Sequence, residues 1–156
     1  MSSLSIRVRR ASVDDAPLVT DLAQRLLTEL GGFQIGDPAA LVSFCQQLLA
    51  SEHYTAFLAF DGVTGASLGL LTLNECSALY VAGRLGWIQE LYVAPEARSL
   101  GVGWQLIAAA MAYGREHGWQ RLEVNTPDVE AWPRTVAFYR RAGFLGGSSH
   151  LRLLLA

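Results

Sequence analysis

A glycine-rich turn between a strand and a helix constrains the fold of this chain more than any other feature. Residues 87–93 form an apolar run typical of a strand, and residues 103–117 carry apolar side chains at helical spacing. The turn between them contains the pattern Arg98-x-x-Gly101-x-Gly103. A strand, a tight turn and a helix in this order favour a mixed α/β domain.

The same turn predicts an anion site. Gly101 and Gly103 have no side chain, so the backbone can approach a ligand closely. The N–H groups of the loop then converge at the positive end of a helix, which suits a pyrophosphate. Arg98 either adds positive charge at the rim of this site or makes a structural ion pair. A bare Gly-x-Gly pattern is equally compatible with a helix start that binds no ligand.

Two common nucleotide-binding loops are excluded. A P-loop needs a lysine after its last glycine, but all 12 basic residues of this chain are arginine. A dinucleotide-binding fingerprint needs a third glycine at the position that Leu106 occupies. The absence of lysine also excludes enzymes that form a Schiff base with their substrate.

The overall composition indicates a globular protein. The chain has 156 residues, 51% of them apolar, so we expect a single domain over residues 1–156. Its net charge of −2 argues against a nucleic-acid partner. No apolar run is long enough to span a bilayer and no secretory signal is recognisable, so we expect a cytoplasmic protein without a membrane partner. The histidines and cysteines are scattered, which predicts no metal site.

Hydrophobic periodicity predicts ten elements in the order βααβββαβαβ. Ser12 and Asp15 have the spacing of a capping box at the start of the first helix. The apolar stripe of that helix consists of Leu18, Leu22, Leu26 and Leu30. Strands are expected at residues 4–10, 55–60, 67–73, 87–93, 121–124 and 150–155, with a loop at 83–86. Helices are expected at residues 12–30, 38–51, 103–117 and 133–142.

Two segments resemble the motifs of one enzyme family. Residues 90–103 read ELYVAPEARSLGVG and resemble the acetyl-CoA motif of the GNAT N-acetyltransferase superfamily, whose core is Arg/Gln-x-x-Gly-x-Gly/Ala. Residues 137–144 read AFYRRAGF and are similar to the family's second motif, on its fourth helix and the following turn. The two motifs stand in the expected order, and the predicted elements match over nearly the whole chain.

The resemblance implies a fold, a co-substrate and an activity. The fold is α/β (α+β mixed), of the GNAT acyl-CoA N-acyltransferase type, with a central mixed sheet of six to seven strands flanked by about four helices. The activity is transfer of an acetyl group from acetyl-CoA, without a metal, to a primary amine of a small molecule or peptide by direct attack in a ternary complex. The resemblance also allows a homodimer in which the last, leucine-rich strand takes part.

The resemblance also implies a cofactor site, with one departure from the family pattern. The cofactor-binding residues it implies are Leu91, Tyr92, Val93, Arg98, Ser99, Leu100, Gly101, Val102, Gly103, Trp104, Asn125 and Tyr139. Many members carry an asparagine seven residues before the tyrosine, where this chain has Trp132. That difference puts one polar contact near the pantetheine arm in doubt, and Asn125 is the candidate substitute.

Transfer to an amine requires a base, because an amine with a pKa of about 10.4 is mostly protonated at neutral pH. Glu90 is the candidate. Alternation along the strand puts it on the face shared by Ile88 and Tyr92, and the resemblance places a carboxylate base here in many members. The alternative is an exposed or ion-paired strand glutamate.

The leaving CoA thiolate requires a proton donor, and the tetrahedral intermediate requires a donor for its oxyanion. The resemblance assigns the first role to Tyr139, for which the alternative is a core tyrosine beside Val136 and Phe138. It points to a backbone N–H near Tyr92 or Val93 for the second role.

The acceptor is the least defined part of this interpretation. The resemblance bounds its site by residues 30–37 and by segments near Trp87 and Trp132. Phe33 would add a further aromatic ring, and a cation would be drawn by Glu29, Asp37, Glu75 and Asp128. A second hypothesis is a sensor or regulatory module of the same fold that binds acyl-CoA without turnover, and a third is a structural protein with an empty loop.

Overall fold

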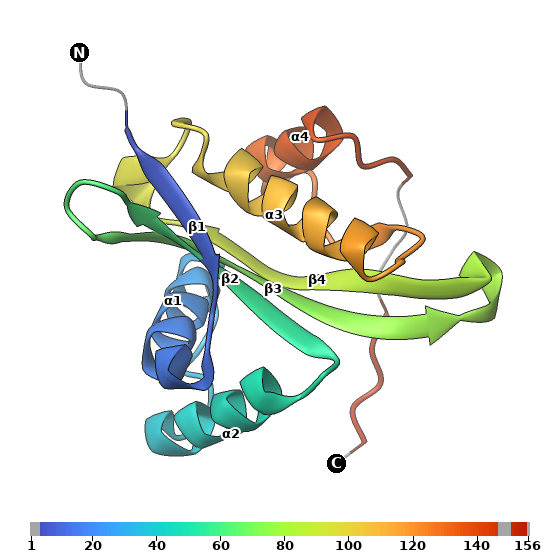
Figure 1. The fold of residues 1–156 in the computed structure, drawn as a ribbon, viewed down its shortest axis with the longest axis horizontal. Helices are drawn as coiled ribbons and strands as arrows, with labels where there is room; N and C mark the ends of the chain where they lie inside the picture. Colours follow the sequence, from blue (N-terminus) through green and yellow to red (C-terminus); the bar gives the residue numbers. More distant parts are fainter. Residues whose placement is uncertain (1–3, 147–150, 156) are drawn as a thin grey trace.

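The computed structural model describes residues 4–146 and 151–155 and has one sheet with helices on both faces (Figure 1). The strands lie in the order β1-β2-β3-β4-β5, with bounds Ile6–Arg10, Tyr54–Asp61, Ser67–Ala78, Gly83–Val93 and Leu122–Val124. β1 to β4 pair antiparallel, and β5 pairs parallel with β4. The helices are α1 (Ala16–Glu29), α2 (Pro38–Ala50), α3 (Val102–Glu116) and α4 (Pro133–Arg141). These elements confirm the predicted mixed α/β class.

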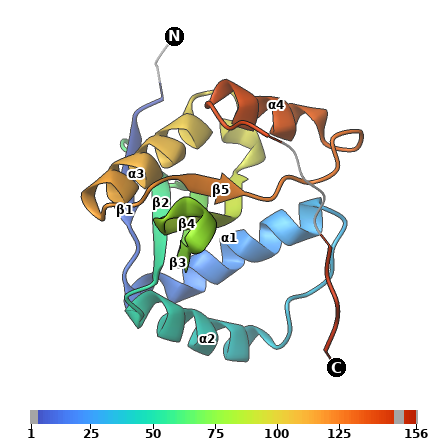
Figure 2. The same cartoon turned by 90° about the vertical axis from the view of Figure 1, so that its right-hand side faces the viewer.

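The sheet separates two hydrophobic cores. α3 and α4 cover one face, where Leu106 packs in a cluster with Leu71 of β3. α1 and α2 cover the other face, where Leu22 packs in a cluster with Leu58 and Leu70. Figure 2 shows the two helix pairs on opposite sides of the sheet. Leu70 and Leu71 are neighbours on β3 but belong to different cores. Successive side chains of β3 therefore point to opposite faces of the sheet, and both faces are covered by helices.

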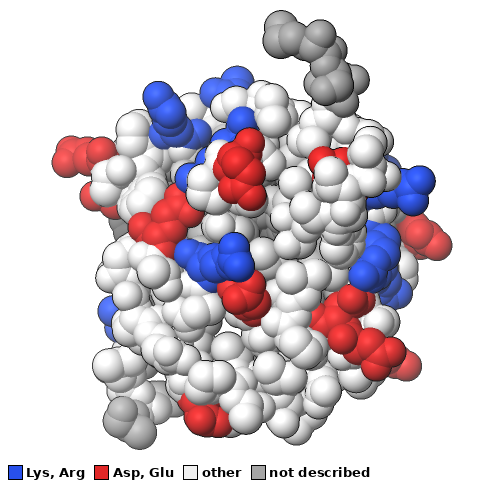
Figure 3. All heavy atoms as spheres, turned by 90° about the vertical axis from the view of Figure 1, so that its left-hand side faces the viewer, with Lys and Arg blue, Asp and Glu red and all other residues white. Residues whose placement is uncertain are grey.

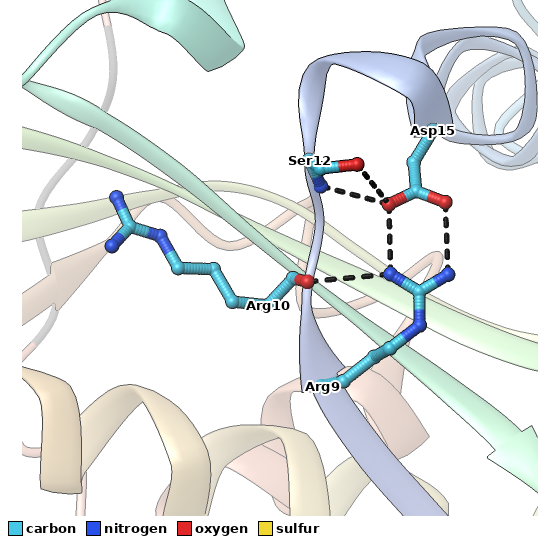
Figure 4. A network of polar contacts seen from close by, with 4 residues as sticks. All are labelled: Arg9, Arg10, Ser12 and Asp15. Carbon is cyan, nitrogen blue, oxygen red and sulfur yellow. Dashed lines mark hydrogen bonds and ion pairs between the residues drawn. The ribbon is translucent and has the colours of Figure 1, made fainter.

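The predicted capping box is confirmed, and it caps the 3-10 turn Val13–Asp15 that leads into α1. The Ser12 backbone N–H donates to Asp15 Oδ2 at 2.7 Å, and the Arg9 guanidinium donates to both Asp15 oxygens at 2.7 and 2.8 Å (Figure 4). These bonds stabilise the ionised carboxylate, so the pKa of Asp15 lies well below its usual range. The predicted stripe extends too far, because Leu30 lies past the helix end and is exposed.

The predicted loop at residues 83–86 is wrong, because these residues are part of β4. β3 and β4 form a long hairpin in which Glu75 pairs with Gly86 and Ala78 pairs with Gly83. A Cβ at Gly86 would lie 2.1 Å from Trp119 Cζ3, so packing against the indole explains this glycine. A glycine in a sequence is compatible both with a turn and with close packing, and at Gly86 the reason is close packing.

The described residues form five strands, fewer than the six to seven expected. The last predicted strand is not observed: residues 151–155 have no strand assignment and their leucines are exposed, while His150 lies outside the described residues. No described helix is both long and apolar enough to cross a membrane.

Charges of opposite sign are mixed on the surface. Arg25 pairs with Asp21 along α1 at 3.0 Å, and Arg84 pairs with Glu75 across the β3–β4 hairpin at 2.8 Å. On the face shown in Figure 3, basic and acidic side chains lie next to one another. Each exposed pair contributes little to stability, about 0 to 1 kcal/mol.

Candidate active site

A cavity of about 1040 Å³ opens where β4 and β5 diverge. The two strands pair over Gly86–Ile88 and Leu122–Val124, after which β5 ends while β4 continues to Val93. The wall is built by the end of α1, the second half of β4, the loop before α3, the residues after β5, and α4. The divergence therefore leaves one edge of β4 facing a cavity instead of a strand.

Backbone N–H groups of β4 face this cavity. The N–H of Glu90 points to β3, where it donates to Thr72 Oγ1 at 3.0 Å, and the N–H of Ala94 donates to the Leu68 carbonyl at 2.8 Å. Since successive N–H groups of a strand point to opposite edges, those of Leu91 and Val93 point to the cavity side. These two groups match the position expected for an oxyanion donor.

The loop before α3 takes the conformation that its glycines allow. Gly101 is the N-cap of α3 at φ 94°, a left-handed conformation that favours glycine. The Gln105 N–H bonds to the Gly101 carbonyl at 3.0 Å as the helix begins, so the N–H groups of residues 102–104 precede the intrahelical bonds. Both the loop and this helix start line the cavity. The predicted geometry of an anion site is present.

Gly103 is a glycine for a different reason from the expected one. A Cβ there would lie 3.0 Å from Phe138 Cζ, so the absent side chain allows α3 and α4 to pack closely. Close approach of a ligand thus remains the expected reason for Gly101 in the loop, whereas the packing of α3 against α4 explains Gly103.

Arg98 makes a structural ion pair, one of its two predicted alternatives. Its Nη2 lies 2.5 Å from Glu29 Oε2, and its Nε donates to the Val93 carbonyl at 3.0 Å. The Glu29 carboxylate raises the pKa of Arg98 further. The pair joins the end of α1 to the loop, and both residues line the cavity.

The fold brings the predicted cofactor-binding residues to one place. All of them line the cavity except Leu100, whose side chain is 54% exposed. Asn125 lies on the wall after β5, and Trp132 lies on the same wall at the N-cap of α4. The two positions considered for the missing asparagine contact thus face the same space.

Tyr139 is buried and lines the cavity. Its side chain is 6% exposed and packs edge-on against Phe138 and Phe144, with ring centroids 5.5 Å apart in both cases. Burial raises the pKa of the Tyr139 phenol above its ordinary value of 10, so the hydroxyl keeps its proton and serves as a hydrogen-bond donor. The alternative of a core tyrosine is confirmed, and the side chain also lines the cavity, whereas the role of proton donor stays a prediction.

A bulge in β4 corrects the predicted face of Glu90. Thr72 pairs with Glu90 but the next residue, Leu73, pairs with Ile88, so Gln89 is an extra residue in β4. Ile88 therefore belongs to the core under α3, whereas Tyr92 belongs to the core under α1 and α2. Simple alternation from Ile88 to Tyr92 was wrong because it did not include the bulge.

Glu90 is partly buried behind the cavity wall, on the side of α1 and α2. Its carboxylate accepts a hydrogen bond from Thr72 Oγ1, and it acts electrostatically on Cys45 and Tyr54 of the core beneath α2. Burial raises the pKa of Glu90, an effect that the Thr72 hydrogen bond partly offsets. Neither an exposed nor an ion-paired glutamate is observed.

Most of the acidic residues expected near an acceptor have other roles. Asp37 caps α2 through the Ala40 N–H at 3.0 Å, Glu75 pairs with Arg84, and Asp128 accepts the Glu130 N–H at 3.2 Å. Glu29 is the one of the four that lines the cavity. Of the expected aromatic residues Trp132 lines it, whereas Phe33 is 76% exposed and, like Trp87, lies outside the wall.

The sequence missed two residues that matter for the geometry. Gln89 is the bulge residue and lines the cavity, and Thr72 holds Glu90 from the neighbouring strand. The pairing of β3 with β4, which joins residues 18 positions apart, carries no local sequence signal. Among the described residues, no cluster of histidine, cysteine or acidic side chains is suited to hold a metal ion.

Comparison with known sequences identifies the family of this chain. Residues 20–144 match the Acetyltransferase (GNAT) family. An aminoalkylphosphonate N-acetyltransferase of Salmonella typhimurium is 30% identical over 150 residues, covering 96% of this chain and 90% of that protein.

Comparison with solved structures shows the same fold. A predicted acetyltransferase from Clostridium acetobutylicum, solved with acetyl-CoA, has a TM-score of 0.80 at 17% identity and covers 97% of each chain. An aminoglycoside acetyltransferase from an uncultured soil metagenomic sample, solved with sisomicin, has a TM-score of 0.75 at 23% identity and covers 97% of this chain and 95% of that one. With the family match over most of its length, the chain belongs to the acetyltransferase (GNAT) family and is an acetyl-CoA-dependent acyltransferase.

Proposed function

We propose that this protein moves an acetyl group from acetyl-CoA to a primary amine of a small molecule or peptide, by direct attack in a ternary complex. The observation that carries the proposal is one continuous cavity that joins the helix start at Gly101, the open edge of β4 and the Tyr139 phenol. Such a cavity is long enough to place a phosphate-bearing donor and an acceptor around one reacting carbon.

The donor is proposed to bind along the loop and the open edge of β4. The N–H groups at the start of α3 bind the pyrophosphate, because they lack intrahelical partners and lie at the positive end of the helix. The N–H groups of Leu91 and Val93 pair with the pantetheine amides or stabilise the oxyanion. The side chains that complete this binding site are Tyr92, Arg98, Ser99, Val102, Trp104 and Asn125.

The reaction forms one bond and breaks another. The amine lone pair attacks the thioester carbonyl carbon, and collapse of the tetrahedral intermediate breaks the C–S bond. Tyr139 donates a proton to the departing thiolate, a role that its raised pKa permits because the phenol is protonated throughout the neutral range. The amine loses its proton, which leaves an amide and CoA as products.

Glu90 is proposed to accept the amine proton through water. Its carboxylate does not line the cavity, so it does not contact the amine directly. A general base acts through one intervening water when geometry requires it. Its raised pKa, caused by burial, makes it a stronger base than an exposed glutamate.

The acceptor end of the cavity favours a compact amine. Its wall combines Leu26 of α1 and Leu30, which follows α1, with the Trp132 ring, and Glu29 provides one carboxylate. The curated relative acts on an aminoalkylphosphonate, and one structural relative is an aminoglycoside acetyltransferase. Both kinds of amine therefore belong in the first acceptor panel.

The proposal is tested in two steps with the full chain. Acetyl-CoA should raise the melting temperature, and CoA thiol should be released when an aminoalkylphosphonate, an aminoglycoside or a peptide with a free N-terminus is added. Stabilisation without thiol release from any amine would favour the acyl-CoA sensor. A melting temperature unchanged by acetyl-CoA would contradict the donor site.

A further inference from the structure

Two buried polar side chains and one partly buried carboxylate lie together on the α1–α2 side of the sheet, behind the cavity. Tyr54 of β2 is 7% exposed, Thr72 of β3 is 1% exposed, and Glu90 of β4 lies beside them. Burying such groups is costly unless each finds a hydrogen-bond partner. The cluster lies at the bulge in β4, where the cavity begins.

The Thr72 hydroxyl makes two hydrogen bonds to Glu90. It donates to Glu90 Oε2 and accepts the Glu90 backbone N–H at 3.0 Å. A hydroxyl has one proton to donate and two lone pairs to accept with. Because the Glu90 N–H takes an accepting position of the hydroxyl, the Thr72 oxygen is held beside the Glu90 carboxylate, to which it donates its single proton.

We propose that Thr72 is a positioning residue, which holds the Glu90 carboxylate ionised at the β4 bulge so that it can take the proton of the acceptor amine. The inference rests on the proposed role of Glu90 as the base. The direction of the hydrogen bonds carries it: a protonated Glu90 would have to compete with the proton of Thr72, whereas the ionised form accepts it.

The other groups that face Glu90 do not compete for this role. Tyr54 on β2 and Cys45 on α2 are the titratable neighbours, and burial and the Glu90 charge raise the pKa of both, so both are neutral near pH 7. The α1 side chains buried toward the sheet are Ala16, Val19, Thr20 and Leu22, none of which titrates. On its own strand the nearest titratable residue on the same side is Tyr92.

The bulge explains why the pairing is specific. If Gln89 were paired as an ordinary strand residue, the register set by Leu73 and Ile88 would place Thr72 opposite Gln89, and its hydroxyl would meet a different side chain. The bulge thus lies directly after Ile88, where the pairing of β4 with β5 ends, and it aligns the hydroxyl with the carboxylate at that point.

Two substitutions at one position test the inference. Thr72→Val replaces the hydroxyl with a methyl group of similar shape, and Thr72→Ser keeps the hydroxyl. The measurement is the pH dependence of kcat/KM for acetyl transfer to the best amine of the panel. A hydrogen bond to the ionised form lowers the pKa of an acid, so Thr72→Val should move the acidic limb upward by about one pH unit, and Thr72→Ser should leave it in place. The KM for acetyl-CoA should stay the same in both.

The controls separate this inference from the proposed function. If Glu90→Gln removes the acidic limb but Thr72→Val leaves it unmoved, the inference is overturned and the base assignment stands. If Glu90→Gln leaves the limb unmoved, the base assignment fails, and the inference fails with it. Where Thr72→Val does not fold, Thr72→Ala removes the same hydroxyl with a smaller side chain, and circular dichroism with a melting curve shows which variants are folded.

Discussion

Tyr139 is buried and Glu90 is partly buried, and although both have a raised pKa, the fold places them differently. Tyr139 lines the cavity from α4, with its ring fixed between Phe138 and Phe144. Glu90 lies on the opposite side of β4, held by a hydroxyl from the next strand. One group is positioned by helix packing and the other by the register of two strands.

Tyr139 thus lies where a substrate would contact it, whereas Glu90 lies behind the strand that forms the cavity wall. In the proposed mechanism Tyr139 acts on the thiolate directly, whereas Glu90 acts through water and depends on its hydrogen-bond partner Thr72. Removing Tyr139 should therefore affect the chemical step more than removing Glu90, and the effects should differ in their dependence on pH.

The largest expected effect is that of Tyr139→Phe, because it removes the donor to the leaving thiolate. We expect kcat to fall about 100-fold while the affinity for acetyl-CoA stays nearly the same, since the ring and its packing remain. Thiol-release kinetics and calorimetric binding measure the two quantities. Tyr113→Phe, a tyrosine of α3 outside the cavity wall, is the matched control. Equal losses in both variants would remove Tyr139 from the acid role.

Glu90→Gln should have the next largest effect, a decrease of about tenfold in kcat/KM at pH 7 and a flattened acidic limb. Water can still pass the amine proton to solvent, which limits the loss. The control is Glu75→Gln, which removes a carboxylate from the surface of the hairpin. A profile that keeps its acidic limb in Glu90→Gln would identify another base.

The same substitution has a consequence for stability. A carboxyl whose pKa is raised by folding binds its proton more tightly in the folded state, so its contribution is lost as pH rises through the folded pKa. The melting temperature of the wild-type protein should thus fall relative to that of Glu90→Gln as pH rises from about 4.3, the usual pKa of glutamate. Parallel melting curves over this range would show that the carboxyl is not perturbed.

Gly101→Ala tests the loop on the Tyr139 side. Gly101 has φ 94°, where an L side chain is strained, so we expect a loss of about 1 to 2 kcal/mol in the free energy of unfolding together with weaker acetyl-CoA binding. Gly65→Ala is the matched control, because Gly65 has φ 75° in the β2–β3 turn and an added Cβ meets nothing within 4 Å. If both variants bind acetyl-CoA more weakly, or neither does, the loop at Gly101 is not part of the acetyl-CoA site.

Glu29→Gln should have the smallest effect, and it concerns the ion pair that joins α1 to the loop. We expect the free energy of unfolding to fall by less than about 1 kcal/mol, as for other exposed pairs, with unchanged acetyl-CoA affinity because Arg98 still bonds to the Val93 carbonyl. Asp21→Asn, which breaks the Arg25 pair on the same helix, is the control. A clear change in affinity would show that the Arg98 charge is available to the cofactor.

The sequence predicted the part of the site around the Gly101 loop and Tyr139 better than the part around Glu90. Gly101, Tyr139 and the helix starts have local signals in glycine spacing, caps and apolar periodicity, and these are the features that the structure reproduces. The hydrogen bond from Thr72 to Glu90 depends on strand register, which pairs residues far apart in sequence and has no local pattern.

Three errors have the same physical origin. The bulge at Gln89 reversed the face assigned to Ile88, and Gly86 indicated a turn although the Trp119 indole requires it. The leucines of residues 151–155 have strand-like composition but no strand pairing. Each depends on what a segment packs against, and composition alone does not carry that information.

The central claim is direct transfer of an acetyl group from acetyl-CoA to an amine within this cavity. Intact-protein mass spectrometry after mixing the protein with acetyl-CoA, before and after addition of amine, tests it most directly. The account predicts an unmodified protein in both samples, and one released CoA thiol for each acetylated amine once the amine is present. An acetylated protein that forms without amine and loses its acetyl group when amine is added would contradict direct attack.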